Sequence, residues 1–165
     1  MHREQEILKK VMNEDHFDRR RSRAIQSIVS DNLDRLTKIV TDQKSSQWTD
    51  VDGFPLVFFC VVSHAHTCLN YLLKLGADIH SELPNKEYLI HTAITCENEF
   101  ALRQFLILGL DPNVPSTNEQ NSPLHYAHIR GNESFIRLLE DCGADTRKRN
   151  AKGTLPRDIN REDNR

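Results

Sequence analysis

Two cysteines and two histidines fall within the short segment CVVSHAHTC at positions 60–68. Cys60, His64, His66 and Cys68 are the ligand types of a Cys2His2 zinc site, and a thiol near a histidine can also act as a nucleophile. Common zinc modules take their ligands from two separated pairs, whereas these four share one segment. We therefore expect the cysteines to be small apolar residues of helices and the histidines to occupy a solvated turn. A metal-binding or thiol-dependent enzyme is the alternative interpretation.

A second pair of histidines, His91 and His125, recurs 34 residues apart. A catalytic histidine needs a nucleophile or a carboxylate presented with it, and no such residue repeats beside this pair. The chain also lacks the glycine-rich phosphate loops, the H-E-x-x-H zinc motif and the G-x-S-x-G nucleophile motif. We expect a shared structural task for the two histidines, and no catalytic residue, no metal and no cofactor.

The composition indicates one thin or elongated domain. The chain has 165 residues, of which 38% are hydrophobic and 28% charged, so the interior is smaller than that of an average globular domain. Its four cysteines lie in apolar helical patterns, as reduced thiols do. The N-terminal MHREQEILKK has no apolar core of a signal peptide, and the longest apolar run, 56–62, is too short for a bilayer. We expect a soluble protein of the cytoplasm, with the nucleus as a second location.

The charge is unevenly distributed along the chain. Residues 1–23 carry a balance of +2 and residues 146–165 a balance of +4, which leaves −8 on residues 24–145. An acidic body argues against nucleic-acid binding there, because phosphate neutralisation needs clustered cations. It favours a partner with a basic patch. The basic tract DRRRSR at 18–23 fits a solvated helix end, with a nuclear import signal or a phosphate-binding tract as alternatives.

The elements that must position these residues repeat with a period near 33. Gly76, Gly109 and Gly143 each end a helical pattern, and each lies in a similar context: LLKLGADIH, LILGLDPNV and LEDCGADTR. A fixed period of this length, with two short helices in each repeat, is the signature of a solenoid.

Residues 122–127, Ser-Pro-Leu-His-Tyr-Ala, resemble the T-P-L-H-x-A signature of the ankyrin repeat. Ser122 is placed to cap a helix and Pro123 to occupy its first position. Gly131-Asn132 supplies the turn to a second helix whose apolar side holds Ile136, Leu138 and Leu139, and Gly143 takes the left-handed position after that helix. The resemblance implies an all-α ankyrin-repeat solenoid of helix-turn-helix units with projecting β-hairpin-like loops. It also implies that His91 and His125 hydrogen-bond within and between these loops.

The other repeats depart from this pattern. The segment at 87–119 keeps Ile90, His91 and Ala93 but lacks the Ser/Thr-Pro start, and the segment at 53–86 has Phe59 where alanine is expected, which should widen the local helix spacing. We predict a charged segment at 1–23, helical or disordered, and a polar tail at 161–165. Between them lies the ankyrin domain at 24–160, with repeats at 24–52, 53–86, 87–119 and 120–152 and a partial cap at 153–160.

A solenoid of this kind binds through its concave side, where loop tips and the exposed face of the first helices line one surface. The register places Pro84 at a loop tip. It gives as protein-binding residues Val61, Val62, Asn85, Glu87, Thr95, Cys96, Asn118, Glu119, Asn121, Ile129, Arg130 and Lys152. Apolar residues inside a polar rim are typical of a protein interface. The alternative is that Phe59, together with one extra residue in its repeat, rotates the helix and buries the two valines.

The resemblance also implies a function. Small ankyrin proteins include inhibitors of Rel-type transcription factors, viral mimics of those inhibitors and inhibitors of cell-cycle kinases. We therefore expect a non-enzymatic interaction module that is a monomer by itself and binds another protein stoichiometrically, with no nucleic-acid binding by the repeat body and no membrane contact. An adaptor subunit of a larger complex, with residues 1–23 as a docking helix, is a further alternative. Residues 160–165 leave no room for a ligase-recruiting box, which disfavours an adaptor that recruits a ligase.

Overall fold

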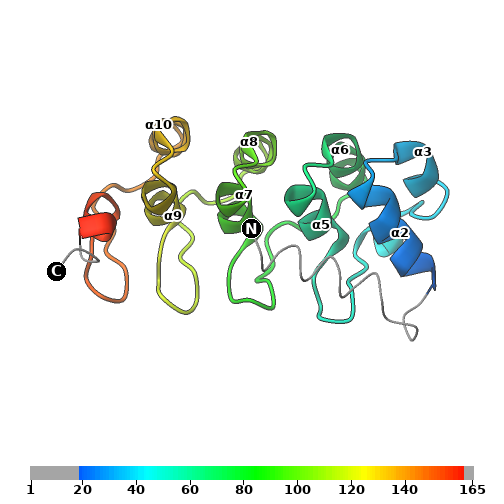
Figure 1. The fold of residues 1–165 in the computed structure, drawn as a ribbon, viewed down its shortest axis with the longest axis horizontal. Helices are drawn as coiled ribbons and strands as arrows, with labels where there is room; N and C mark the ends of the chain where they lie inside the picture. Colours follow the sequence, from blue (N-terminus) through cyan, green and yellow to red (C-terminus); the bar gives the residue numbers. More distant parts are fainter. Residues whose placement is uncertain (1–18, 162–165) are drawn as a thin grey trace. The chain divides into compact units, whose positions relative to one another are not determined.

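The computed structural model describes residues 19–161 of the chain, and this part is built from short helices (Figure 1). It divides at Pro84–Asn85 into two compact lobes. The described residues contain no strand, and the only bridge of β type joins Thr49 to Pro55. None of the described helices is long and apolar enough to span a bilayer. The expected all-α ankyrin-repeat solenoid is thus confirmed, with loops that contain almost no β-ladder.

The N-terminal lobe holds two helical pairs and one additional turn of helix. Its elements are α2 (Arg19–Val29), α3 (Leu33–Leu36), α4 (Gln43–Ser46), α5 (Leu56–Val62) and α6 (His66–Lys74). Helix α2 therefore includes residues 19–23, which the sequence analysis assigned to a separate charged segment; residues 1–18 of that segment lie outside the described residues. The short α4 was not expected, and a capping box closes it, in which Asp42 accepts a hydrogen bond from the Ser45 N–H at 2.7 Å.

The C-terminal lobe holds two regular repeats and a final helical turn. Its elements are α7 (Leu89–Thr95), α8 (Glu99–Ile107), α9 (Pro123–Arg130), α10 (Glu133–Asp141) and the 3-10 helix η1 (Pro156–Arg161). Helix α7 packs on α8 and on α9, and α9 packs on α10 and on η1. Within this lobe the first helices form one row and the second helices another, while the long loops project from the side of the first helices (Figure 1).

Left-handed backbone positions show the repeat more clearly than any residue type does. Asp31, His64, Glu97 and Gly131 have φ values of 43°, 54°, 56° and 64°, and each lies in the turn between the two helices of a pair. A second series, Gly53, Lys86, Gln120 and Gly153, marks the loop tips at the same spacing. Only some of these positions are glycine, so the sequence alone shows each series incompletely.

The Gly-Ala-Asp segment that follows a second helix is hydrogen-bonded to a side-chain amide from the preceding repeat. Asn113 donates to the Gly143 carbonyl at 3.0 Å and accepts from the Asp145 N–H at 2.7 Å. Gln47 makes the same two contacts with Gly76 and Asp78 in the N-terminal lobe, at 2.9 and 3.0 Å. Each pair of contacts satisfies backbone groups just beyond the end of a second helix and joins two successive repeats.

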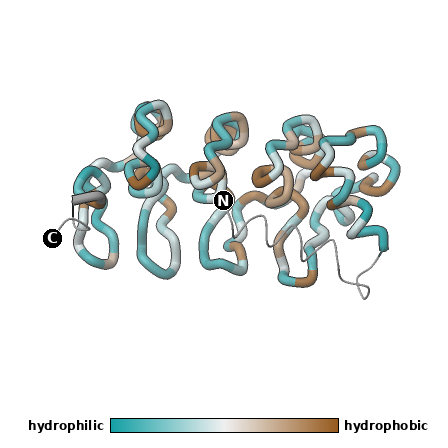
Figure 2. The backbone as a smooth tube through the Cα atoms, in the orientation of Figure 1, coloured by the Kyte–Doolittle hydropathy of each residue, from teal (hydrophilic) through white to brown (hydrophobic). Residues whose placement is uncertain are grey.

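The core lies between the helices of each lobe. In the C-terminal lobe Leu124, Ala127 and Leu139 are buried, as the repeat register requires, and Phe135 is buried beside them. Leu138 is only half-buried, so its expected place in the core is wrong. Phe135 takes that place because it lies four residues before Leu139, on the same face of α10. The projecting loops of this lobe are mostly hydrophilic, whereas α5 in the other lobe is hydrophobic along its whole length (Figure 2).

Candidate protein-binding surface

The two recurring histidines connect successive loops of the C-terminal lobe. His91 Nδ1 accepts a hydrogen bond from the Tyr88 N–H, and its Nε2 lies against the Val114 carbonyl, both at 3.1 Å. His125 repeats the arrangement at the same distances, with the Ser122 N–H and the Thr154 carbonyl. Each ring therefore caps the N-terminus of its own helix and hydrogen-bonds to a backbone carbonyl of the following loop. The expected structural role of both histidines is confirmed.

This arrangement requires neutral imidazole rings. A ring nitrogen that accepts from an N–H while the other donates to a carbonyl fixes one tautomer and leaves no place for a second proton. Burial lowers the pKa of His91 to about 4, although its carbonyl partner favours the charged form. Burial likewise lowers the pKa of His125. Both histidines are therefore structural and uncharged at neutral pH.

Ser122 and His125 have the separation of a catalytic pair without its accessibility. The Ser122 hydroxyl lies 2.8 Å from His125 Nδ1, and both side chains are buried. A triad serine must reach a substrate, and its histidine is oriented by a carboxylate. Here the second ring nitrogen faces the backbone carbonyl of Thr154 instead. The pair fastens the N-terminus of α9 and has no route to a substrate.

The 60–68 cluster does not assemble a metal site or a reactive thiol. Cys60 and Cys68 are buried, whereas His64 lies in an exposed left-handed turn. In residues 19–161 no three histidine, cysteine, aspartate or glutamate side chains are grouped as metal ligands. Burial raises the pKa of Cys68 to about 12 and that of Cys60 well above its usual value, so both remain protonated thiols. This geometry disfavours the metal-binding and thiol-enzyme alternatives.

Backbone hydrogen bonds fix neighbouring loop tips of the C-terminal lobe to one another. The Thr117 N–H donates to the Lys86 carbonyl and, one repeat later, the Ala151 N–H donates to the Glu119 carbonyl, each at 2.9 Å. The predicted tip residues Asn85, Asn118, Glu119 and Lys152 are exposed on these tethered loops. The loops therefore present their side chains from fixed positions, which lowers the entropy cost of binding.

Asn121 is not available as a contact residue, and its prediction is corrected. It is buried, its amide donates to Glu119 at 2.7 Å, and its carbonyl oxygen accepts from the Asn150 amide at 2.9 Å. Because its side chain joins two successive loops, it supports the surface from beneath.

Val61 is likewise buried, which contradicts its predicted exposure, and Val62 is half-buried. Helix α5 packs against both α2 and α6, so six of its seven residues are removed from solvent. The alternative burial of the valines is correct for Val61. The N-terminal lobe therefore loses the apolar anchors that the register assigned to it, while Pro84 is exposed at its tip.

The apolar anchor that remains is Ile129, near the C-terminus of α9. Its side chain is 46% exposed. Arg130 follows it, donates a hydrogen bond to the Thr95 carbonyl and lies 3.9 Å from the Glu97 carboxylate. Thr95 and Cys96, on the preceding repeat, are half-buried. The C-terminal lobe thus offers an apolar centre with a mixed-charge surround.

Tyr126 belongs to this surface and was not predicted. Its hydroxyl donates to Glu87 Oε1 at 2.8 Å, and Asn85 donates to the other oxygen of the same carboxylate at 3.0 Å. Burial, followed by the nearby Glu87 charge, raises the pKa of Tyr126 well above its usual value. The Glu87 carboxylate is therefore held in one orientation. In the sequence, the signal for this contact was the tyrosine of the His-Tyr-Ala signature, one residue after the structural histidine His125.

The comparisons with known proteins agree with this architecture. The family model for ankyrin repeats (3 copies) matches residues 56–150. The nuclear factor NF-kappa-B p105 subunit of Gallus gallus is 27% identical over 147 residues, which are 86% of this chain and 15% of that protein. The ankyrin repeat and SOCS box protein 11 of Homo sapiens is 30% identical over 92 residues, or 56% of this chain and 28% of that protein.

The chain thus spans about a seventh to a quarter of the length of these relatives. Ankyrin repeats generally serve as non-enzymatic modules for protein–protein interaction. This agrees with the hydrogen-bonded loops of the C-terminal lobe and with the exposed Ile129. On the repeat signature, the periodic backbone and the family match together, this chain belongs to the ankyrin-repeat family.

Proposed function

We propose that the chain is a stoichiometric, non-enzymatic binder of another protein, and that the C-terminal lobe supplies the contact surface around Ile129. The observation that carries this proposal is the 46% exposure of an isoleucine on a first helix whose neighbouring loops are fixed by hydrogen bonds. An apolar side chain in a rigid polar surround is a common form of an interface hot spot.

A Rel-type transcription factor is the proposed partner. The similarity to the nuclear factor NF-kappa-B p105 subunit extends over 86% of the chain, and the acidic body of the chain suits a partner with a basic patch. An inhibitor of this type acts by occupying a surface of the transcription factor, so it needs no catalytic group. The cytoplasmic or nuclear location stays a prediction, which microscopy of the tagged chain would check.

The proposal is tested by measuring binding to a purified Rel-type dimer with calorimetry. We expect a defined stoichiometric complex that Ile129→Glu weakens at least tenfold, because loss of a central apolar anchor costs about 2 kcal/mol or more. The matched control is Ile107→Glu. Ile107 lies at the end of α8 and is 76% exposed, so this variant adds the same charge to an exposed isoleucine of the same lobe.

Equal effects of the two variants would contradict the assignment of the surface. If the Rel-type dimer does not bind but another protein is captured through Ile129, the partner is wrong while the surface stands. The melting temperature of both variants should match that of the parent chain, since both side chains are exposed.

A further inference from the structure

Helix α2 of the N-terminal lobe directs its arginines to two different sides. The helix packs on α3 and α5, and its buried face includes Ala24 and Ile28. Successive residues of a helix are about 100° apart, so Arg20 and Arg21 fall on the same half of the helix as this face. Their guanidiniums lie 5.5 and 6.0 Å from the Trp48 ring. These two arginines are therefore engaged within the lobe.

The opposite side of α2 carries a serine between two arginines. Ser22, Arg23 and Gln26 follow Arg19 by three, four and seven residues, so the four residues form one stripe along the helix. Arg19, Arg23 and Gln26 are exposed, and Ser22 is half-buried. Ser22 thus lies on the side of the helix that faces solvent.

The sequence around Ser22 is a substrate pattern for arginine-directed kinases. Residues 19–23 read Arg-Arg-Arg-Ser-Arg, which places arginines three and two residues before the serine. Kinases select substrates by charge pattern, and carboxylates along a kinase's substrate groove select such arginines. Two nearby serines do not meet both conditions. Ser27 is buried, and the exposed Ser30 has Ser27 and Ile28 at the two positions where Ser22 has arginines.

Residues 19–23 can leave the helix without exposing the core. All five are exposed or half-buried, and the first buried residue of α2 is Ala24. A kinase binds its substrate segment in an extended form, so this segment must open for the reaction. The end of a helix opens locally far more often than a whole lobe unfolds. The folded chain therefore meets the requirements for modification at Ser22.

We propose that Ser22 is a phosphorylation site for an arginine-directed protein kinase. The Ser22 Oγ forms a bond to the γ-phosphorus of a nucleoside triphosphate. The bond from that phosphorus to the bridging oxygen breaks, and the nucleoside diphosphate leaves. The hydroxyl proton passes to a carboxylate of the kinase. This chain contributes the acceptor hydroxyl and the arginines that the kinase recognises.

The folded helix accommodates the product on its exposed stripe. A phosphate on Ser22 can pair with the guanidinium of Arg19, three residues earlier, while the buried face stays unchanged. The four arginines give residues 19–23 a formal charge of +4, which the phosphate lowers to about +2. Phosphorylation therefore weakens the attraction of this tract to an anionic surface and leaves the lobe folded.

The test incubates the full chain with magnesium, ATP and a purified arginine-directed serine kinase. Mass spectrometry of the intact chain and of its peptides gives the number of phosphates and their position. We expect one phosphate per chain, at Ser22, and none at this position in Ser22→Ala. Arg19→Gln should lower the kcat/KM of the kinase at least tenfold. The matched control is Arg23→Gln, which removes the same charge from the same stripe after the serine and should lower kcat/KM less than threefold.

A further variant separates modification of the folded chain from modification of unfolded molecules. Ile28→Val shortens a fully buried side chain of α2 and should raise the unfolded population about fivefold. The phosphorylation rate should change less than twofold, because Ile28 lies outside the segment that opens. A fivefold rise would place the reaction in unfolded molecules and overturn the proposal. Absence of phosphate at Ser22, modification chiefly at Ser30, or equal effects of Arg19→Gln and Arg23→Gln would also overturn it.

Discussion

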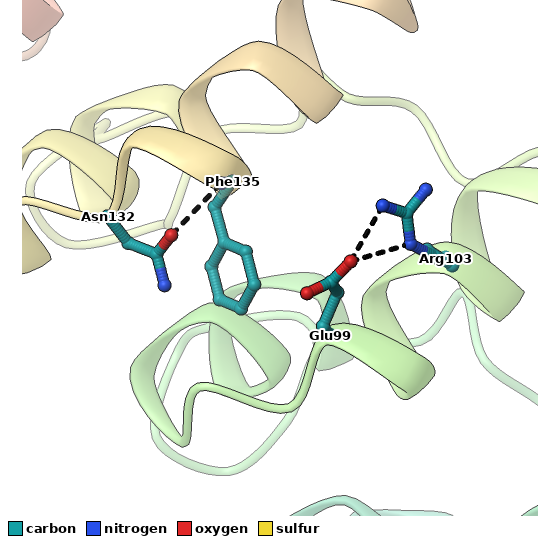
Figure 3. Close-up of polar contacts among 4 residues, drawn as sticks. All are labelled: Glu99, Arg103, Asn132 and Phe135. Atoms are coloured by element: carbon teal, nitrogen blue, oxygen red, sulfur yellow. Dashed lines mark hydrogen bonds and ion pairs between the residues drawn. The ribbon is translucent and has the colours of Figure 1, made fainter.

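Helix α6 of the N-terminal lobe is capped differently from the second helices of the C-terminal lobe. In the C-terminal lobe each cap is local. The Asn98 side chain accepts from the Ala101 N–H at 3.0 Å. The Asn132 side chain accepts from the Phe135 N–H at 3.1 Å (Figure 3). In the N-terminal lobe α6 has no side-chain cap of its own. The carboxylate of Asp31, which is 37 residues away, accepts from the Cys68 N–H at 3.0 Å. A repeat can therefore satisfy the same backbone groups from within or from its neighbour.

The lobes also differ at the position of the structural histidine. Counting back 68 residues from His125 gives Val57, which is buried in a helix that is apolar throughout. Aromatic contacts accompany it: the Phe54 and Phe58 rings are 4.4 Å apart, and Phe58 meets Phe59 edge-on at 5.5 Å. The N-terminal lobe thus relies on apolar burial where the C-terminal lobe relies on buried hydrogen bonds between loops. The two kinds of stabilisation respond differently to mutation and to pH.

The largest expected effect is that of Phe59→Ala, which removes a fully buried ring from the apolar lobe. The free energy of unfolding should fall by about 3–5 kcal/mol, because the truncation leaves a cavity as well as less buried surface. Trp48 is the single tryptophan of the chain and lies in this lobe, with the Arg20 guanidinium 5.5 Å from its ring. Urea unfolding followed by its fluorescence measures the loss directly.

Hydrogen exchange on the same variant shows which lobe loses stability. Amides of residues 19–84 should lose more protection in Phe59→Ala than amides of residues 85–161 do. An equal loss in both lobes would show that they unfold as one cooperative block, and the contrast between them would then have no thermodynamic meaning.

The next effect is a loss of stability of the C-terminal lobe on acidification. The native pKa of His91 is about 4, below the ordinary value of 6.5, so between these limits only the unfolded chain takes up the proton. Stability is therefore intact above pH 6.5 and declines as the pH falls towards 4, by roughly 3 kcal/mol in all from this group. The lowered pKa of His125 acts in the same direction.

The measurement is amide exchange of residues 85–161 at a series of pH values between 7 and 4.5, corrected for the intrinsic exchange rates. His91→Gln is the control, since it removes the titrating group: its stability should be lower but should depend less on pH. If the C-terminal lobe of the parent chain keeps its full stability down to pH 4.5, the proposed stabilisation by neutral, hydrogen-bonded histidines is contradicted.

Much of the fold could be predicted from sequence. The 34-residue spacing of His91 and His125 and the glycine positions gave the repeat and the structural role of the histidines, because each depends on local chemistry. The burial of Val61 and Asn121 could not be obtained in this way. It depends on what neighbouring elements cover, and a register only states which face a residue occupies. The turn at His64 was expected, but the left-handed backbone at Asp31, His64 and Glu97 was not, since no glycine marks it.

The contrast in helix capping predicts effects of about 1 kcal/mol. Asn132→Ala removes a local cap from α10, and Asp31→Ala removes the distant cap from α6. Each should cost about 0.5–2 kcal/mol in the lobe that contains it. Although burial alone would raise it, hydrogen bonds from Thr67 and Cys68 lower the pKa of Asp31. The contribution of Asp31 should therefore disappear as the pH falls through that lowered value, whereas the Asn132 cap should not titrate.

Both capping variants are measured by denaturant unfolding at pH 7 and pH 3, with exchange data to assign the loss to a lobe. The contrast would be lost if the Asp31→Ala effect stayed constant over this range while the Asn132→Ala effect changed, because the distant cap would then not act through its carboxylate.

The smallest expected effect comes from the ion pair between Arg103 and Glu99 on α8. The two side chains lie 2.6 Å apart at i and i+4, and both are about half-exposed (Figure 3). Solvent screening limits such a pair to about 0.3–0.5 kcal/mol. Arg103→Ala should therefore change the midpoint of unfolding only slightly, and the change should vanish in 1 M salt. If Arg103→Ala lowers the free energy of unfolding by 2 kcal/mol or more, surface charge contributes as much as the hydrogen bonds of the buried histidines. The contrast with the apolar N-terminal lobe would then not depend on those histidines.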